Sequence, residues 1–223
     1  MQITAAIFAA AAMASLANAH GYFVTPKARQ PGPTFQAECG MQAYYQMSGD
    51  INGNVQGLEQ TVKGQSDYNP AQCNLWKCKG MKYQDNTANI QTYHPGESVP
   101  MNFQIRAPHT GSANVSIIDL STPHGTVLGS PLISWSVYAS TSTSIPASEE
   151  NFSVTMPTNL GSKCAAKGAC AIQMYWDAPS VQQTYESCVD FTLSAAGAGK
   201  REEMMGRVHG RDFGARAVGV VEE

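Results

Sequence analysis

The sequence predicts an all-β protein, an antiparallel β-sandwich of the immunoglobulin or fibronectin type III kind with long disulfide-tied loops and short helices. Three observations predict it. Short segments alternate apolar and polar residues, the pattern of strands that bury one face. Glycine, proline, serine and asparagine separate these segments, as in sandwiches with many turns. The chain also holds six cysteines, an even number that indicates disulfides in a secreted protein.

The amino terminus has the pattern of a secretory signal peptide over residues 1–19. An apolar run from Ile7 to Leu16 leads to Ala17-Asn18-Ala19, the small-x-small pattern that signal peptidase cleaves. The run is too short for a stable bilayer-spanning helix. We therefore expect a secreted, extracellular protein whose mature chain begins at His20.

The rest of the chain divides by composition into one domain, residues 20–193, and a Gly/Ala-rich tail, residues 194–223, which we expect to be flexible. The formal net charge is −3 and the chain lacks basic clusters. This composition argues against nucleic acid and anionic membranes as partners. We expect a monomer.

The expected strands lie mostly in the second half of the domain. Alternation is clearest at residues 99–105, 152–156, 172–176 and 189–193, and residues 114–118 and 131–139 are further strand candidates. Residues 30–95 differ, being rich in Gly, Gln, Asn and Tyr, and here we expect loops with short helices, for example at 35–47. Such a loop region on a rigid sandwich is a natural binding surface.

Six cysteines allow fifteen pairings, so the sequence leaves most of the connectivity open. The cysteines are Cys39, Cys73, Cys78, Cys164, Cys170 and Cys188. We predict that Cys164 pairs with Cys170 across a turn, and that Cys188 pairs with one of the first three. A zinc site at Cys73 and Cys78 is the weaker interpretation in a secreted chain. The sequons at Asn114 and Asn151 agree with secretion and predict N-glycosylation.

His20 is the first candidate metal ligand. Cleavage before it would create a free α-amine beside an imidazole, and the two nitrogens can chelate one ion. A second histidine facing them would complete a planar three-nitrogen site of the kind that suits Cu(II). His109 is the best second ligand because it ends a predicted strand and enters a turn. The alternative is that His20 is merely tolerated at the cleavage site.

The other histidines are weaker candidates. His94 and His124 lie in expected loops, and His209 lies in the tail. A solvated loop position explains each of them without a metal.

Gln183 and Tyr185 are two residues apart, so on a strand they share one face. The alternative for this pair is a core tyrosine beside a surface glutamine. Three acidic residues, Asp177, Glu186 and Asp190, could also supply a carboxylate pair for glycoside hydrolysis, although acids near strand ends are ordinary.

Together these residues resemble the lytic polysaccharide monooxygenases, which are secreted copper enzymes that cut crystalline polysaccharides oxidatively. The resemblance is closer to the fungal auxiliary activity family sixteen. It rests on "HGYFVTPKARQPG" at the mature start and on "CNLWKCKG", "IRAPHTG", "PLISWSVYAS" and "QTYESCVDF". It spans residues 20–193, and the tail lies outside it.

The resemblance implies one copper ion bound by His20 and His109, with Tyr185 at the axial position and Gln183 in the second sphere. It also implies cellulose as substrate, oxidation at C1, O2 or H2O2 as oxidant and an external electron donor. Tyr22 and Phe23 could stack on sugar rings, although neighbours on a strand point to opposite faces, so at least one should pack inward. A non-catalytic copper carrier and a metal-free carbohydrate-binding module are the alternatives.

Overall fold

The computed structural model describes residues 20–194. The predicted signal peptide, and the predicted tail after its first residue, lie outside the described residues, as does His209. In the part of the chain that the structure describes, no helix is long and apolar enough to cross a membrane.

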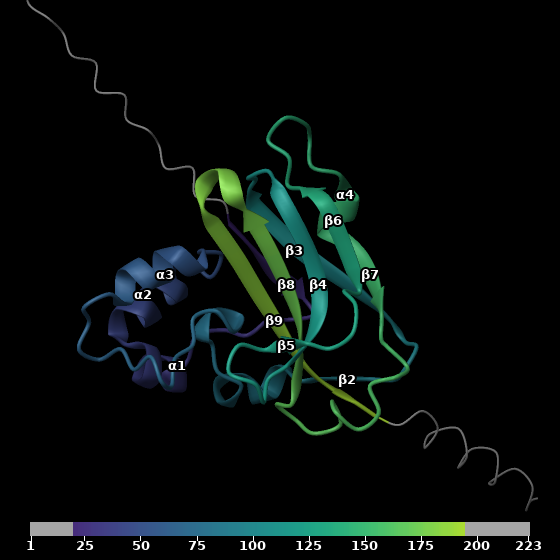
Figure 1. Cartoon of the computed structure of the whole chain (residues 1–223), viewed down its shortest axis with the longest axis horizontal. Coiled ribbons are helices and arrows are strands. Elements are labelled where there is room, and N and C mark those ends of the chain that lie inside the picture. Colours follow the sequence, from purple (N-terminus) through teal and green to yellow (C-terminus); the bar gives the residue numbers. More distant parts are fainter. Residues whose placement is uncertain (1–19, 195–223) are drawn as a thin grey trace, which may run out of the picture.

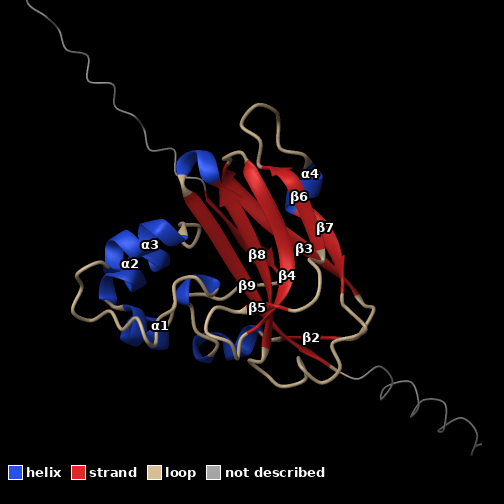
Figure 2. Ribbon diagram, in the orientation of Figure 1, coloured by secondary structure: helices blue, strands red, loops and turns tan. Residues whose placement is uncertain are grey.

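Two β-sheets form the centre of the molecule (Figures 1 and 2). The smaller sheet has the order β1-β3-β7, and its strands are β1 (His20–Thr25), β3 (Ser98–Ala107) and β7 (Asn151–Thr155). The larger sheet has the order β2-β9-β8-β4-β5, with β6 also paired to β4. Its strands are β2 (Gln91–Tyr93), β4 (Gly111–Asp119), β5 (Thr126–Val127), β6 (Ile133–Tyr138), β8 (Cys170–Ala178) and β9 (Gln183–Leu193). The predicted antiparallel sandwich is confirmed; β2 and β9 form the single parallel pair recorded for these strands.

The core lies between the two sheets, and the alternating residues of the sequence form it. In β3 the side chains of Val99, Met101 and Phe103 are buried while their neighbours are more exposed. Phe23 of β1 packs edge-on against Phe103, with ring centroids 5.3 Å apart. Phe23 is therefore the inward-facing member of the Tyr22–Phe23 pair, as strand geometry requires.

Strand β9 departs from simple alternation, because every residue from Thr184 to Phe191 is buried. One face packs into the sandwich core, and the other is covered by the segment between β1 and β2. Cys188, for example, packs on that outer side with Cys78, Ile118 and Ala171. Both faces of this strand are thus inside the protein.

The covering segment holds three short helices, α1 (Pro33–Cys39), α2 (Met41–Gly49) and α3 (Val55–Val62), and two 3-10 turns, η1 (Cys78–Gly80) and η2 (Gln84–Asn89). Figure 1 shows the helices on the side of β9. The expected helix at 35–47 is in fact split between α1 and α2. Gly40 separates them with φ 91°, a conformation that favours glycine. Two short elements remain, α4 (Ala147–Glu150) and the 3-10 turn η3 (Pro179–Val181).

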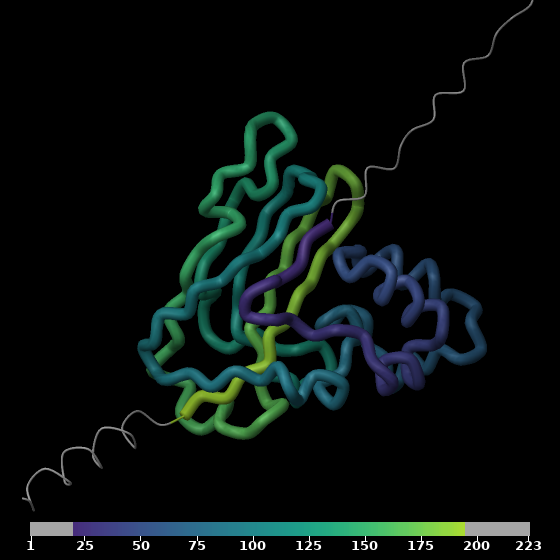
Figure 3. Tube along the Cα trace, turned by 180° about the vertical axis from the view of Figure 1, so that it is seen from behind, coloured from purple at the N-terminus to yellow at the C-terminus, as the bar shows by residue number. Residues whose placement is uncertain are grey.

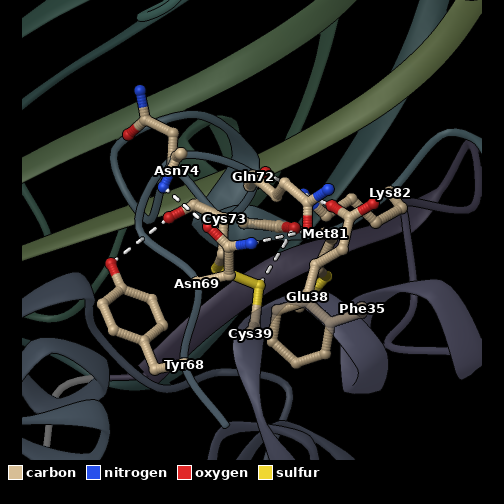
Figure 4. Close-up of a disulfide and its surroundings, with 12 residues drawn as sticks. Phe35, Glu38, Cys39, Tyr68, Asn69, Gln72, Cys73, Asn74, Met81 and Lys82 are labelled. Carbon is tan, nitrogen blue, oxygen red and sulfur yellow. Dashed lines mark hydrogen bonds and ion pairs between the residues drawn. A yellow bond between two sulfur atoms is a disulfide. The ribbon is translucent and has the colours of Figure 1, made fainter. Parts of the chain in front are cut away.

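All six cysteines form disulfides: Cys39–Cys73, Cys78–Cys188 and Cys164–Cys170. The predicted Cys164–Cys170 pair is confirmed, and Cys188 does reach one of the first three cysteines. Figure 4 shows the first disulfide beside Phe35 in the small core of the helical segment, where the Tyr68 hydroxyl donates to the Cys73 carbonyl at 3.2 Å. The second disulfide joins this segment to β9.

Candidate metal centre

Strand register brings the predicted site residues to one end of the sandwich. His20 lies opposite Ala107 in the β1–β3 pair, and Ala107 comes two residues before His109. In the larger sheet Ser112 lies opposite Asp177, and Asp177 lies opposite Thr184. The β3–β4 turn with His109 is therefore at the same end as the start of β9. Figures 1 and 3, seen from opposite sides, both place the start of β1 beside the start of β9.

His20 is fixed at the edge of an open cleft. Its ring Nε2 lies 2.9 Å from Asp50 Oδ2, and its side chain is 21% exposed. Because Nε2 contacts the carboxylate, Nδ1 and the main-chain nitrogen are the His20 atoms that can chelate a metal in a mature chain. Gly21 allows the close β1–β3 approach here, since a Cβ at this position would lie 2.4 Å from the buried Phe103 ring.

The cleft has a volume of about 760 Å³ and is lined by His20, Tyr22, Gln30, Asp50 and Arg106 among others. Tyr22 is partly exposed on it, in contrast to the buried Phe23. The cleft is polar and open, so a large hydrophilic substrate could approach His20 from solvent.

His109 lies in the turn between β3 and β4 and is 9% exposed. Its Nδ1 is buried and has no hydrogen-bond partner within residues 20–194. The turn is tied to the loop after β6, because the Thr141 amide donates to the Thr110 hydroxyl at 2.8 Å. A buried ring nitrogen without a partner is costly, and a bound ion is one arrangement that satisfies such a group.

Gln183 and Tyr185 share one face of β9, as predicted, and the Tyr185 hydroxyl donates to Gln183 Oε1. The Tyr185 ring is fully buried and packs against Trp176, with centroids 4.6 Å apart. Burial raises the pKa of Tyr185 above its ordinary range, and a hydrogen bond with Asn54 offsets this only in part. Tyr185 is thus a core residue, as the alternative interpretation proposes, yet its neutral hydroxyl is oriented by Gln183.

Two of the three acidic residues that could have served glycoside hydrolysis, Asp190 and Glu186, have internal partners. Asp190 is buried and accepts two hydrogen bonds from the Arg29 guanidinium at 2.7 and 2.8 Å. Glu186 is 1% exposed and accepts from the Lys79 amide at 3.1 Å. Burial raises the pKa of Glu186 to about 7, against the lowering effect of Lys79. Neither carboxylate is free to face a sugar, which argues against hydrolysis by an acid pair.

The two other histidines within residues 20–194 are exposed, as expected. His94 Nδ1 lies 2.9 Å from the Ser194 hydroxyl, and His124 Nδ1 lies 3.0 Å from the Asn74 amide nitrogen. Within residues 20–194 no group of three or more His, Cys, Asp and Glu side chains could hold a metal. A site at His20 and His109 therefore depends on the main-chain amine as its third nitrogen.

Sequence reasoning missed two residues, Asp50 and Lys79. Asp50 contacts His20 from the loop after α2, and Lys79 is fully buried behind that loop. An aspartate in a Gly-Asp-Ile-Asn-Gly turn and a lysine between a cysteine and a glycine carry no local signal for such contacts.

The fold and these residues define an immunoglobulin-like β-sandwich protein with two histidines gathered at one end of the sheets. A family model described as lytic polysaccharide mono-oxygenase, cellulose-degrading, matches residues 20–191. The chain belongs to this family, whose class of function is oxidative cleavage of polysaccharides. No curated protein matches the chain.

The chain is also similar to several solved structures. An AA10 lytic polysaccharide monooxygenase from Streptomyces lividans is 15% identical, with a TM-score of 0.41, covering 78% of this chain and 99% of that one. A CBM33 protein of Bacillus amyloliquefaciens in complex with Cu(I) is 15% identical, with a TM-score of 0.40, covering 78% and 100%. A chitin binding domain from Burkholderia pseudomallei is 9% identical, with a TM-score of 0.40, covering 79% and 100%.

Proposed function

We propose that this chain is a secreted, copper-dependent lytic polysaccharide monooxygenase of the fungal auxiliary activity family sixteen type, which cleaves cellulose with oxidation at C1. The observation that carries the proposal is the convergence of His20, the unpartnered buried nitrogen of His109 and the Tyr185–Gln183 pair at one end of the sandwich. The resemblance of residues 20–193 to that family supplies the substrate and the position of oxidation.

The donor set fits copper. In the mature chain the His20 amine, the His20 ring and the His109 ring offer three nitrogens, the ligand type that Cu(II) prefers. Bound copper would supply one-electron chemistry with O2 or H2O2 after reduction by an external donor. The amine exists only after cleavage between Ala19 and His20, so the proposed signal peptide is a precondition of the site.

The neighbouring side chains have separate roles in this proposal. Tyr185 would limit access to a bound copper ion, because its buried ring excludes solvent and burial keeps its hydroxyl protonated. Gln183 accepts a hydrogen bond from that hydroxyl, and we expect its side chain to lie near the place where the oxidant would react. Tyr22 and Arg106 line the open cleft beside His20, where they can contact the polysaccharide.

The decisive test incubates copper-loaded mature protein with amorphous cellulose and a reductant, and analyses soluble products by mass spectrometry. We expect aldonic-acid oligosaccharides that disappear in His109→Ala. The copper EPR spectrum should show a type-2 signal with nitrogen coupling that is also lost in this variant. Copper binding without products or peroxide would indicate a non-catalytic carrier. Cellulose binding without copper binding would indicate a carbohydrate-binding module.

A further inference from the structure

The loop between α2 and α3, residues 50–54, lies against the proposed site and has a carboxylate at its start. Asp50 Oδ2 contacts the His20 Nε2 at 2.9 Å. The other oxygen, Oδ1, accepts from the Asn52 amide at 3.0 Å and from the Asn52 side chain at 2.7 Å. Both oxygens are thus engaged, which fixes the plane of the carboxylate.

The loop itself is held from behind by Lys79. This side chain is fully buried, and its Nζ donates to the carbonyls of Ile51 at 2.6 Å and Gly53 at 3.1 Å. These carbonyls flank Asn52, so the ammonium clamps the turn that presents Asp50. The contact explains why a lysine is retained inside the protein at a considerable cost in solvation.

The backbone around Lys79 is also unusual. Cys78 and Lys79 have φ of 56° and 55°, a left-handed conformation that non-glycine residues rarely adopt. Such a conformation persists when the surrounding structure enforces it. Here the Cys78–Cys188 disulfide and the hydrogen bond from the Lys79 amide to Glu186 enforce it. The lysine is therefore anchored to β9, the strand that carries Tyr185.

The end of the same loop also reaches β9. Asn54 caps α3 by accepting from the Gly57 amide at 2.7 Å. Gln56, in the first turn of that helix, accepts from the Thr184 amide at 2.8 Å and donates to its hydroxyl at 3.0 Å. Residues 50–56 therefore contact both His20 and the strand position between Gln183 and Tyr185.

We propose that Asp50 is a positioning residue for His20, held in place by the buried Lys79. A carboxylate oxygen 2.9 Å from Nε2 favours the neutral tautomer that carries its proton on that nitrogen, because the oxygen can only accept a hydrogen bond there. Nδ1 then carries the lone pair on the side of the ring where it can close a chelate with the amine. The contact also fixes the orientation of the ring before any metal binds. The part of this inference that concerns copper rests on the function proposed above.

The first test needs no metal. Mature wild-type protein, Asp50→Ala and Asp50→Asn are compared by long-range proton–nitrogen NMR at a pH where the His20 ring is neutral. The wild type should show the single Nε2–H tautomer of His20. Asp50→Ala should show averaged tautomer shifts, and Asp50→Asn should be intermediate, because one amide oxygen cannot serve both His20 and Asn52. Identical His20 spectra in all three proteins would overturn the positioning role.

The second test measures copper affinity by calorimetry and records the EPR spectrum. Loss of an outer-sphere partner of a metal-bound histidine costs about 10- to 100-fold in metal affinity, so we expect at least a tenfold weaker affinity in Asp50→Ala. The matched control is Asp67→Ala, because Asp67 accepts from the Met41 amide at 2.7 Å at the start of α2. This control removes a carboxylate from the same helical segment, and copper binding should not change.

The two tests separate the two proposals. Failure of the wild type to bind copper overturns the proposed function, while the NMR comparison still decides whether Asp50 holds the ring. Copper affinity and EPR parameters that are the same in Asp50→Ala and the wild type overturn the copper role of Asp50 and leave the enzyme function standing.

Discussion

The Cys78–Cys188 disulfide should contribute more to stability than the Cys164–Cys170 disulfide. The first joins residues 110 positions apart, and the second joins residues 6 positions apart. With the chain-entropy model, closing these loops in the unfolded state stabilises the fold by about 5 kcal/mol and about 2 kcal/mol respectively. The difference of about 3 kcal/mol arises from the unfolded chain, because the long loop loses more conformational freedom.

The assay is equilibrium unfolding in guanidinium chloride of two double variants, Cys78→Ala/Cys188→Ala and Cys164→Ala/Cys170→Ala. Paired substitution leaves no free thiol, and both disulfides are buried, so the loss of packing is comparable. We expect the long-loop variant to lose more of the free energy of unfolding, by about 3 kcal/mol. An equal or larger loss in the short-loop variant would refute the loop-entropy reasoning.

Three further predictions follow from buried charges and from the chain start. Arg29→Met leaves the buried Asp190 carboxylate unpaired, so it should lower the free energy of unfolding, measured in urea, by about 3–5 kcal/mol. A loss under about 1 kcal/mol would contradict a stabilising role of this buried ion pair. Burial lowers the pKa of Lys79 from 10.5 to about 8, so between these two pH values the unfolded chain binds the proton that the folded chain has lost. In that window the free energy of unfolding of the wild type, relative to that of Lys79→Met, should therefore rise by up to about 1.4 kcal/mol per pH unit. If urea unfolding shows that the difference between the two proteins does not change with pH, this pKa is excluded. One additional residue before His20 converts the amine to an amide and removes a proposed ligand, so copper affinity by calorimetry should fall by more than the roughly 10- to 100-fold that loss of an outer-sphere partner costs. Thermal stability should not change, and undiminished affinity would exclude the amine as a ligand.

Much of the fold follows from local patterns. The strands of the sandwich could be predicted because a half-buried strand alternates apolar and polar residues, and β3 retains this pattern in the structure. The full length of β9 is harder to predict from the sequence, because a strand that is covered on both faces loses the alternation of apolar and polar residues. The sequence does not predict the split of the helix at Gly40, since a glycine inside a helical stretch does not by itself show which conformation it adopts.

The candidate site also has residues that local patterns predict and contacts that they do not. His109 lies at the end of a recognisable strand, and Gln183 and Tyr185 are two residues apart on another, so short-range geometry predicts their orientation. The Asp50 contact with His20 and the Lys79 contacts with the loop join residues 26 to 30 positions apart, across elements whose relative placement no local pattern encodes.

The sequence by itself determined the sandwich class, the histidine at the predicted start of the mature chain, the second histidine at a strand end and the shared face of Gln183 and Tyr185. Each of these depends on patterns within single segments or on overall composition. Tertiary structure alone decided which cysteine pairs with Cys188, that the helical segment covers β9, and that Asp50 and Lys79 support His20. These features depend on packing between distant segments, where burial and hydrogen bonding select the partners.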